Sequence, residues 1–449
     1  MAFLIDSVLD FKLRFVVFMH LFIKSKTTNR ILKNTTFLAI GSIVSKGIGF
    51  FIFIYIARIL GPASYGNYWT IIGFISLFAI ITTFGLDMAV LREGAKNLDN
   101  IDEYQNKLFP IRLYLSFSAI VLTCGIVFFL PYSFELKALI IIASPILIIG
   151  GTIQAGLSEH FNTTYRIVER MHHIALFQII RMIIFVGIVL VFISYEKLNV
   201  LSVIIALLLS SFITLILRFL HSKKYVHYKF NLKIDWEFCK PLLYVSFWFG
   251  LATLLATIIS KIDIQMLYWL SSSKEVGYYS AAWQVVICGE MFISGLSLSL
   301  FPTSSRSILK PGYSRKLFIL VSIITTLSCI IAAITVFTSE SIIVSLFGER
   351  FLSSAALLSI LIWFIPIRLL MIWGSQSLEC MNALKIRLVG FVVPLILNIS
   401  LNFYLIPKYD AIGAAIASII AYLFMLIILT YLGRKVLHAK MKGGLNVIE

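Results

Sequence analysis

Charged residues are scarce in this sequence. Asp, Glu, Lys and Arg together make up 13% of the 449 residues, whereas a soluble domain carries roughly 25%. Acidic residues are the scarcer kind, because 21 Asp and Glu stand against 38 Lys and Arg. So little charge cannot cover a water-facing surface, which excludes a soluble globular enzyme. The hydrophobic content of 60% excludes a disordered chain as well.

Two chemical signatures are also missing. The five cysteines are scattered and none forms a C-x-x-C pair, which excludes a secreted disulfide scaffold. No G-x-x-x-x-G-K-[ST] motif occurs, so the chain has no P-loop for a nucleotide-driven pump. We expect no cofactor. We also expect no nucleic-acid partner, because basic clusters in a membrane protein report orientation and attraction to anionic lipids.

Long apolar runs are what the sequence has instead. Runs of about 20 residues recur along the chain, and a helix of that length spans the ~30 Å hydrocarbon core of a bilayer. The predicted fold class is therefore an all-α polytopic membrane protein. We predict twelve spans, near residues 36–60, 68–90, 109–131, 137–158, 173–194, 199–220, 244–270, 279–302, 317–338, 354–376, 386–406 and 411–433.

The connections between these spans fall into two alternating sets. One set, with both tails, carries 28 Lys and Arg residues, and the other carries six. The positive-inside rule places the basic set, and so both termini, in the cytoplasm. The apolar stretch 15–23 is too short to cross the bilayer, so we expect an interfacial amphipathic helix there. Met19 is an in-frame alternative start, which leaves open whether residues 1–18 are translated.

The two halves of the chain repeat each other at an offset of about 211 residues. Each repeat has an even number of spans, so the two repeats are parallel. Transporters use such repeats to build a central cavity that opens alternately to the two sides; a duplicated scaffold without transport is the alternative. The predicted units are an N-terminal segment at 1–33, six-helix bundles at 34–220 and 241–433, a basic cytoplasmic linker at 221–240 and a cytoplasmic tail at 434–449.

Several short motifs follow one another in a family-specific order. The stretch ARILGPASYGNY occupies Ala57–Tyr68, directly after the first span. The others are Phe84–Asp87, Val276–Ala282, Leu300–Pro302, Leu346–Glu349, Leu401–Pro407 and Gly413–Ala415. Together they cover nearly all of residues 34–433 and resemble the Wzx-type polysaccharide flippases. That family belongs to the multidrug/oligosaccharidyl-lipid/polysaccharide exporter superfamily.

The resemblance implies two six-helix bundles around a central cavity in a bacterial inner membrane protein. It implies translocation of an undecaprenyl-diphosphate-linked oligosaccharide repeat unit from the cytoplasmic to the periplasmic leaflet, for surface polysaccharides such as O-antigen. It also implies contacts with membrane lipids and with the polymerase and chain-length machinery of the pathway. No enzyme activity is implied.

The charges at the span ends, Arg58, Arg112, Lys137, Arg218 and Arg387, are assigned to the connections. Seven charged residues then remain inside the predicted spans: the cations Lys46, Arg181, Lys261 and Arg368 and the acids Asp87, Asp263 and Glu290. Each costs about 2.5–3.5 kcal/mol at the bilayer centre, so each should face protein or a wet cavity. We predict that the cations line a substrate-binding cavity, because diphosphate oxygens accept charge-assisted hydrogen bonds. Structural ion pairs or snorkelling to the interface are the alternatives.

The acids are predicted to serve coupling or gating. A buried carboxylate can bind and release H+ or hold Na+ during a transport cycle, and Asp263 and Glu290 are the best candidates. Lys46 and Glu290 lie near mid-depth on spans one and eight, so we predict that they pair across a lateral opening. A permanent pair that only joins the bundles is the alternative. Asn398 and Asn402, one turn apart, are expected to bond between helices, with a cavity-lining role as the alternative.

Two other functions compete with transport of a lipid-linked glycan. An ion-coupled multidrug exporter of the same fold is the nearest, although four cations against three acids disfavour a cationic cargo. A membrane-embedded polymerase is less favoured, because the longest external connection is short. Glu159, His160, His172 and His173 lack metal-ligand spacing on what is predicted to be a cytoplasmic loop, so no metal site is expected.

Overall fold

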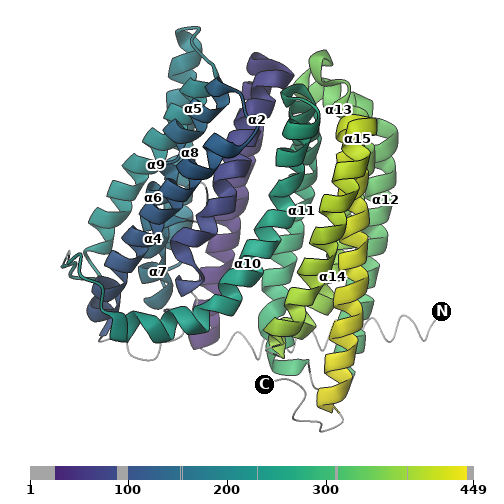
Figure 1. The fold of residues 1–449 in the computed structure, drawn as a ribbon. Coiled ribbons are helices and arrows are strands. Elements are labelled where there is room, and N and C mark those ends of the chain that lie inside the picture. Colours follow the sequence, from purple (N-terminus) through teal and green to yellow (C-terminus); the bar gives the residue numbers. More distant parts are fainter. Residues whose placement is uncertain are drawn as a thin grey trace.

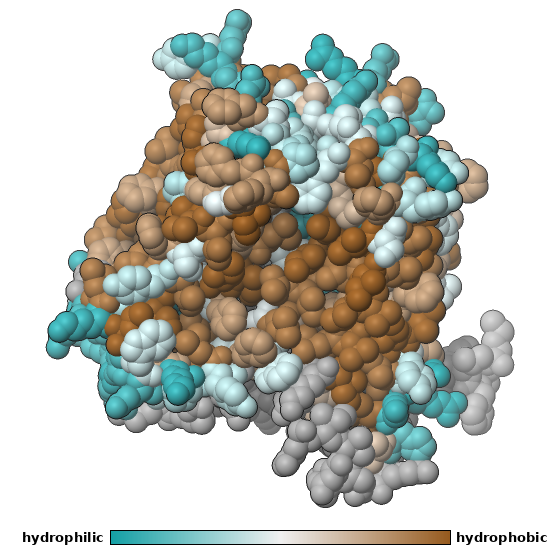
Figure 2. Space-filling view, viewed as in Figure 1, coloured by the Kyte–Doolittle hydropathy of each residue, from teal (hydrophilic) through white to brown (hydrophobic). Residues whose placement is uncertain are grey.

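The computed structural model describes residues 26–441, except 88–89, 91–99, 152, 154, 230, 309–311 and 382. Within these residues the chain is helical and has no strand. Eight of the described helices are long and apolar enough to cross a membrane. On the face shown in Figure 2, apolar residues form a wide belt, and hydrophilic residues gather toward the two ends. The predicted all-α polytopic fold is confirmed, while the predicted interfacial helix at 15–23 lies outside the described residues.

The first half of the chain forms one bundle. Its helices are α2 (Lys26–Thr83), α4 (Ile101–Phe129), α5 (Phe134–Ala143), α6 (Ile146–Ile149), α7 (Gly156–Ile167), α8 (His172–Ser194) and α9 (Val200–Ser222). Helix α2 contains the first two predicted spans, which divide at Gly61, where φ is 73°. Glycine reaches this left-handed conformation at no steric cost, and Pro62 directly afterwards starts the next helical segment.

The second half forms the other bundle. Its helices are α10 (Trp236–Leu270), α11 (Ser273–Ser307), α12 (Tyr313–Phe347), the short 3-10 helix η2 (Glu349–Phe351), α13 (Ser354–Leu361), α14 (Phe364–Cys380) and α15 (Leu384–Met441). Helix α15 contains the last two predicted spans, which divide at Asp410, where φ is 49°. The two bundles stand side by side, with α11 between them (Figure 1).

The turns of the two bundles confirm the internal duplication. The break at Gly61 corresponds to Ser272, which caps the start of α11, and the two positions are 211 residues apart. The break at Asp410 corresponds to Asn199, which caps the start of α9, again at 211 residues. The 211-residue offset predicted from the sequence therefore also separates structurally equivalent turns.

The fourth span differs from its prediction as a single helix over 137–158. It divides into α5, α6 and α7, and the chain between α6 and α7 includes Gly150 and Gly151 with φ of 77° and 93°. The tenth span is divided at the corresponding place, between α13 and α14. Helix α7 continues to Ile167, so the predicted cytoplasmic loop at 159–172 is wrong over most of its length.

The bundles meet differently at their two ends. We call the end that holds Gly61 and Ser272 the turn end, and the end that holds residues 223–235 the linker end. At the turn end, α2 packs closely on α11, and Ile54, Ala57 and Tyr65 of α2 join the core of the second bundle. At the linker end, the first part of α10 runs beneath the first bundle (Figure 1), where Cys239 and Leu242 join a core with α4.

Candidate functional site

Three of the predicted site residues come together inside the second bundle. Lys261 of α10 lies near enough to Glu290 of α11 for the carboxylate to attract its ammonium group. Tyr422 of α15 lies within electrostatic reach of both Glu290 and Arg368 of α14. All three charged side chains are half-buried. Two cations and one acid from three helices thus surround one region within the second bundle.

Asp263 lies at the centre of a separate buried network. Its side chain is on the second-bundle side of α10, and the residue is 4% exposed. It accepts hydrogen bonds from Asn402 Nδ2 at 2.6 Å, Ser418 Oγ at 2.5 Å and Tyr279 Oη at 3.1 Å. Asn398 Oδ1 accepts a further bond from Asn402 at 3.1 Å. Asn402 therefore bonds between helices, as expected, and Asn398 bonds to it within α15.

The chemistry of this network suits a small cation or a proton. The carboxylate, amide and hydroxyl groups around Asp263 all offer oxygen atoms, which hard cations prefer as ligands. Asn402 Oδ1 is buried without a hydrogen-bond partner in the part of the chain that the structure describes. No group of three His, Cys, Asp or Glu residues that could hold a metal ion occurs among the described residues.

Arg181 lies apart from these residues, inside the first bundle. It is 8% exposed, and its charge interacts with Tyr68 of α2 and repels Arg218 of α9. Its Cδ lies 3.3 Å from the place where a Cβ on Gly151 would be, so the guanidinium stem packs on the interruption of the fourth span. The four predicted cations therefore do not form one cavity lining in this structure.

Lys46 does not pair with Glu290. Among the ion pairs of the described residues neither of these two side chains occurs, and Lys46 is exposed on α2. The predicted contact fails because equal depth in the membrane does not fix the direction in which a helix presents a side chain. Lys261 is the basic residue beside Glu290 instead.

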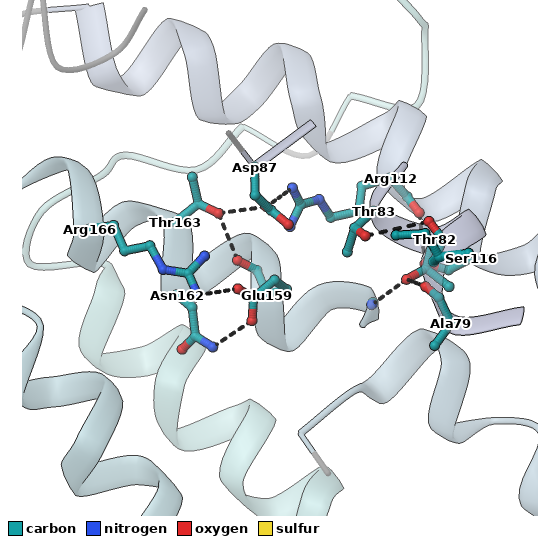
Figure 3. A network of polar contacts seen from close by, with 12 residues as sticks. Ala79, Thr82, Thr83, Asp87, Arg112, Ser116, Glu159, Asn162, Thr163 and Arg166 are labelled. Atoms are coloured by element: carbon teal, nitrogen blue, oxygen red, sulfur yellow. Dashed lines mark hydrogen bonds and ion pairs between the residues drawn. The ribbon is translucent and has the colours of Figure 1, made fainter. Parts of the chain in front are cut away.

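Asp87 is held in an ion pair at the linker end. It pairs with Arg112 of α4 and accepts a hydrogen bond from Thr163 of α7 at 2.8 Å (Figure 3). Arg112 was counted with the loop charges, yet it is fully buried, as is Arg218. Glu159 and His160, placed on a loop by their sequence, are buried in α7.

A buried polar contact closes the turn end between the bundles. Gln265 of α10 is 0% exposed. Its Oε1 accepts a hydrogen bond from Tyr132 Oη at 2.6 Å, and its Nε2 donates to the Thr70 carbonyl at 3.3 Å. Tyr132 also packs against Tyr268 and Trp269 with ring centroids 5.3 and 5.9 Å apart. The sequence analysis did not predict this contact, because the residues of one span do not indicate which residue of another span will bond to them.

Comparison with known proteins establishes the family of the chain. Residues 31–308, more than half of its length, match the family described as polysaccharide biosynthesis protein. The chain belongs to the polysaccharide biosynthesis protein family. This match confirms the resemblance seen in the motifs.

This polysaccharide biosynthesis protein is similar in sequence to a probable flippase and similar in fold to membrane transporters of known structure. The probable flippase AglR of Haloferax volcanii is 27% identical over 176 residues, which cover 36% of this chain and only 35% of that relative. The lipid II flippase MurJ in an inward closed conformation has a TM-score of 0.73 at 15% identity, over 88% of this chain and 86% of MurJ. An inward-facing multidrug resistance MATE family transporter of the MOP superfamily has a TM-score of 0.69 at 15% identity, over 91% and 96%. The polysaccharide biosynthesis protein therefore has the fold of these membrane transporters.

Proposed function

We propose that this protein is a flippase for an undecaprenyl-diphosphate-linked oligosaccharide repeat unit. It would move that unit from the cytoplasmic to the periplasmic leaflet of a bacterial inner membrane by alternating access. The family match supports a role in polysaccharide synthesis, and the AglR and MurJ likenesses support flipping as the activity. The observation that carries the proposal is the group of charges Lys261, Glu290 and Arg368 inside a bundle whose core is mainly apolar.

The charge and shape of the cargo fit this site. A diphosphate offers several anionic oxygens, and guanidinium and ammonium groups bind such oxygens by charge-assisted hydrogen bonds. Glu290 attracts the Lys261 ammonium group, so an incoming diphosphate would compete with the carboxylate for that group. The polyprenyl chain would stay in the bilayer, because transfer of each buried CH2 from lipid to water costs about 0.8 kcal/mol.

The orientation of the cycle follows from the basic connections. The linker end carries Lys223, Lys224, Lys229, Lys233 and Lys240, so we place it in the cytoplasm with both termini. The turn end, which Gln265 and its partners close, would then face the periplasm. Polymerase and chain-length proteins of the pathway would receive the cargo on that side.

Energy coupling is assigned to Asp263. Its buried oxygen-rich surroundings would let it exchange H+ or Na+ between states of the transporter. The network joins α10, α11 and α15, so occupation of Asp263 would change how these helices pack. Glu290 lies near the same tyrosine, Tyr422, as Asp263 does, which would link the coupling site to the cargo site.

An ion-coupled multidrug exporter is the second candidate. The likeness to a multidrug resistance MATE family transporter supports it at the level of fold. Two basic groups against one acid at the cargo site favour an anionic cargo over the organic cations of many drugs. A polymerase is less favoured, and no catalytic role is assigned to any residue here.

Neutralising the cargo-site cation tests the proposal. Arg368→Gln should leave completed lipid-linked units on the cytoplasmic leaflet of cells whose upstream and polymerase enzymes are unchanged. Arg350→Gln, an exposed cation of the same type at the end of η2, is the matched control and should export normally. Export by both variants at equal membrane abundance would reject the cargo site. Loss of drug resistance with normal glycan export would favour the exporter.

A further inference from the structure

Helix α7 is polar and yet buried. Its sequence GLSEHFNTTYRI contains six side chains of the kind found on protein surfaces, and every residue except Leu157 and Arg166 is buried. Side chains of these types normally lie in water on the surface of a helix. Here α7 packs between α4 and α9 in the first bundle, so its polar groups need partners inside the protein.

Part of this need is met by two ion pairs. Asp87 pairs with Arg112 and accepts from Thr163, while Glu159 pairs with Arg166 Nη2 at 2.5 Å (Figure 3). Asn162 Nδ2 donates to Glu159 Oε2 at 2.9 Å, and Thr163 Oγ1 also donates to the Glu159 carbonyl at 2.9 Å. Two acids thus face two arginines, and the formal charges of the network balance.

Four side chains of this region keep polar atoms that no described group satisfies. They are both amide atoms of Gln105, Nε and Nη1 of Arg112, both ring nitrogens of His160, and Oδ1 of Asn162. Gln105, Arg112 and His160 are 0% exposed and Asn162 is 5% exposed. A buried donor or acceptor without a partner costs about 1–3 kcal/mol, so a stable bundle needs partners for these atoms.

Three of these side chains lie where α4 and α7 face each other. Gln105 and Arg112 are seven residues apart on α4, which puts them on the same face two turns apart. Phe109 lies between them on that face, and its ring centroid is 5.7 Å from that of His160. The charge of Arg112 acts on the His160 imidazole. Asn162 follows two residues after His160 and therefore lies on the other side of α7.

The chemistry of the unsatisfied atoms identifies the ligand. The Arg112 atoms can only donate, whereas the Gln105 amide and the His160 imidazole both donate and accept. An anion would leave the acceptors unpaired and a cation would leave the donors unpaired. Because the charges already balance, neither is needed. A small neutral molecule that donates and accepts is required, and water is the one at hand.

We propose that α4 and α7 enclose a hydrated chamber at the linker end of the first bundle, in which water completes the hydrogen bonds of Gln105, Arg112 and His160. Water there also solvates the Asp87–Arg112 pair, whose carboxylate side chain is 15% exposed. A solvated ion pair separates at lower cost than a dry one. The chamber would therefore let α2, α4 and α7 change their contacts while the bundle stays folded.

X-ray hydroxyl-radical footprinting of the full chain in nanodiscs tests the chamber directly. Radicals form from water beside a side chain, so buried His160 and Phe161 should be oxidised several-fold faster than Phe185. Phe185 is a matched control, because it is equally buried, at 1% against 3% for Phe161, but lies in an all-apolar core. Equal slow rates at all three positions would show a dry interface and overturn the proposal.

The variant Gln105→Leu gives a second, independent readout. In a dry interface it removes two unsatisfied atoms and should raise the apparent Tm. In a hydrated chamber it removes two satisfied atoms, so the apparent Tm should stay level or fall, and oxidation of His160 should slow. A rise in Tm with unchanged oxidation contradicts the proposal. None of these measurements depends on the cargo, so they hold or fail separately from the proposed flippase activity.

Discussion

Gly66 and Gly277 occupy equivalent places in the two repeats, and each lies against the backbone of the other repeat. A Cβ on Gly66 would collide with the Ser273 carbonyl, and a Cβ on Gly277 would collide with the Pro62 carbonyl. Pro62 and Ser273 are themselves equivalent positions, again 211 residues apart. The turn end is therefore closed by a two-fold-like contact in which only glycine fits.

Side chains at these glycines should hold the turn end open. We expect Gly66→Ala and Gly277→Ala each to destabilise the closed contact by about 1–3 kcal/mol, as overpacking of a tight interface does. Transport should fall, and a cysteine at Ala57, buried at 0% beneath the contact, should react faster with a membrane-impermeant maleimide. Gly125→Ala is the control, because no atom lies within 4 Å of its added Cβ. Similar labelling in all three variants would contradict the closure.

Gln265 should contribute to the same closure through its two hydrogen bonds. Gln265→Leu leaves the Tyr132 hydroxyl and the Thr70 carbonyl without this partner, and we expect a loss of about 1–3 kcal/mol. A double-mutant cycle with Tyr132→Phe, read as apparent Tm, isolates the contact between the two side chains. Strictly additive losses would mean that the 2.6 Å bond between them adds nothing to stability.

A charge exchange between Lys261 and Glu290 distinguishes the observed neighbours from the predicted ones. Lys261→Glu or Glu290→Lys alone puts like charges together and should stop transport, whereas the double exchange should restore it in part. The matched comparison exchanges Lys46 and Glu290, which do not pair in the described structure. Rescue by the Lys46 exchange and not by the Lys261 exchange would show that Lys46 meets Glu290 during the cycle.

Asp263→Asn should uncouple transport from its driving ion. The amide keeps most hydrogen bonds of the network but cannot gain or lose a proton, and it binds Na+ more weakly. Turnover in vesicles should lose its dependence on pH or Na+ and slow by an order of magnitude or more. Ser418→Ala removes one hydrogen bond and keeps the carboxylate, so its ion response should persist. An unchanged response in Asp263→Asn would place coupling elsewhere.

Acid should release the start of α10 from the first bundle. Lys107 Nζ lies 2.9 Å from Asp235, and its hydrogen bond lowers the pKa of the Asp235 carboxyl. A lowered pKa in the folded protein stabilises the contact above the ordinary carboxyl range, and that stability disappears as pH falls through the lowered value. Hydrogen exchange of residues 231–239 should therefore stay slow down to about pH 5 and rise in stronger acid.

The variant Asp235→Asn should show fast exchange already at neutral pH. Glu237→Gln is its control, because Glu237 is an exposed acid two residues away that forms no ion pair among the described residues. Equal exchange in the two variants would mean that Lys107 does not hold this segment.

Hydropathy and periodicity correctly predicted the features that the membrane determines. They gave wrong predictions for residues whose hydrogen-bond partners come from neighbouring helices. The spans, the 211-residue offset and the break at Gly61-Pro62 follow from hydropathy and from local backbone preferences. Helix α7 did not, because average polarity cannot distinguish a loop in water from a helix whose side chains bond to Asp87, to Tyr228 and to the Arg218 carbonyl. Arg112 and Arg218 were counted with the loops for the same reason.

The candidate site was predicted only in part. Polarity within an apolar span singled out Asp263, Asn398 and Asn402, which the fold brings together. Tyr279 and Ser418 were missed, because hydroxyl groups are common in membrane helices and carry little signal alone. The pairing of Lys46 with Glu290 was predicted from their similar depth in the membrane. Depth gives only the position along the membrane normal, whereas a contact also depends on where the helices lie and which way the side chains point.

The attachment of α10 beneath the first bundle breaks the symmetry that the duplication created. Gly85 leaves no room for a side chain beside Ser246 and Gly250, and Phe84 packs its ring 6.2 Å from that of Phe247. This contact and the Lys107–Asp235 pair tie the start of α10 to the first bundle at the linker end. Any movement of the two bundles relative to each other must therefore either carry this part of α10 with the first bundle or break both contacts.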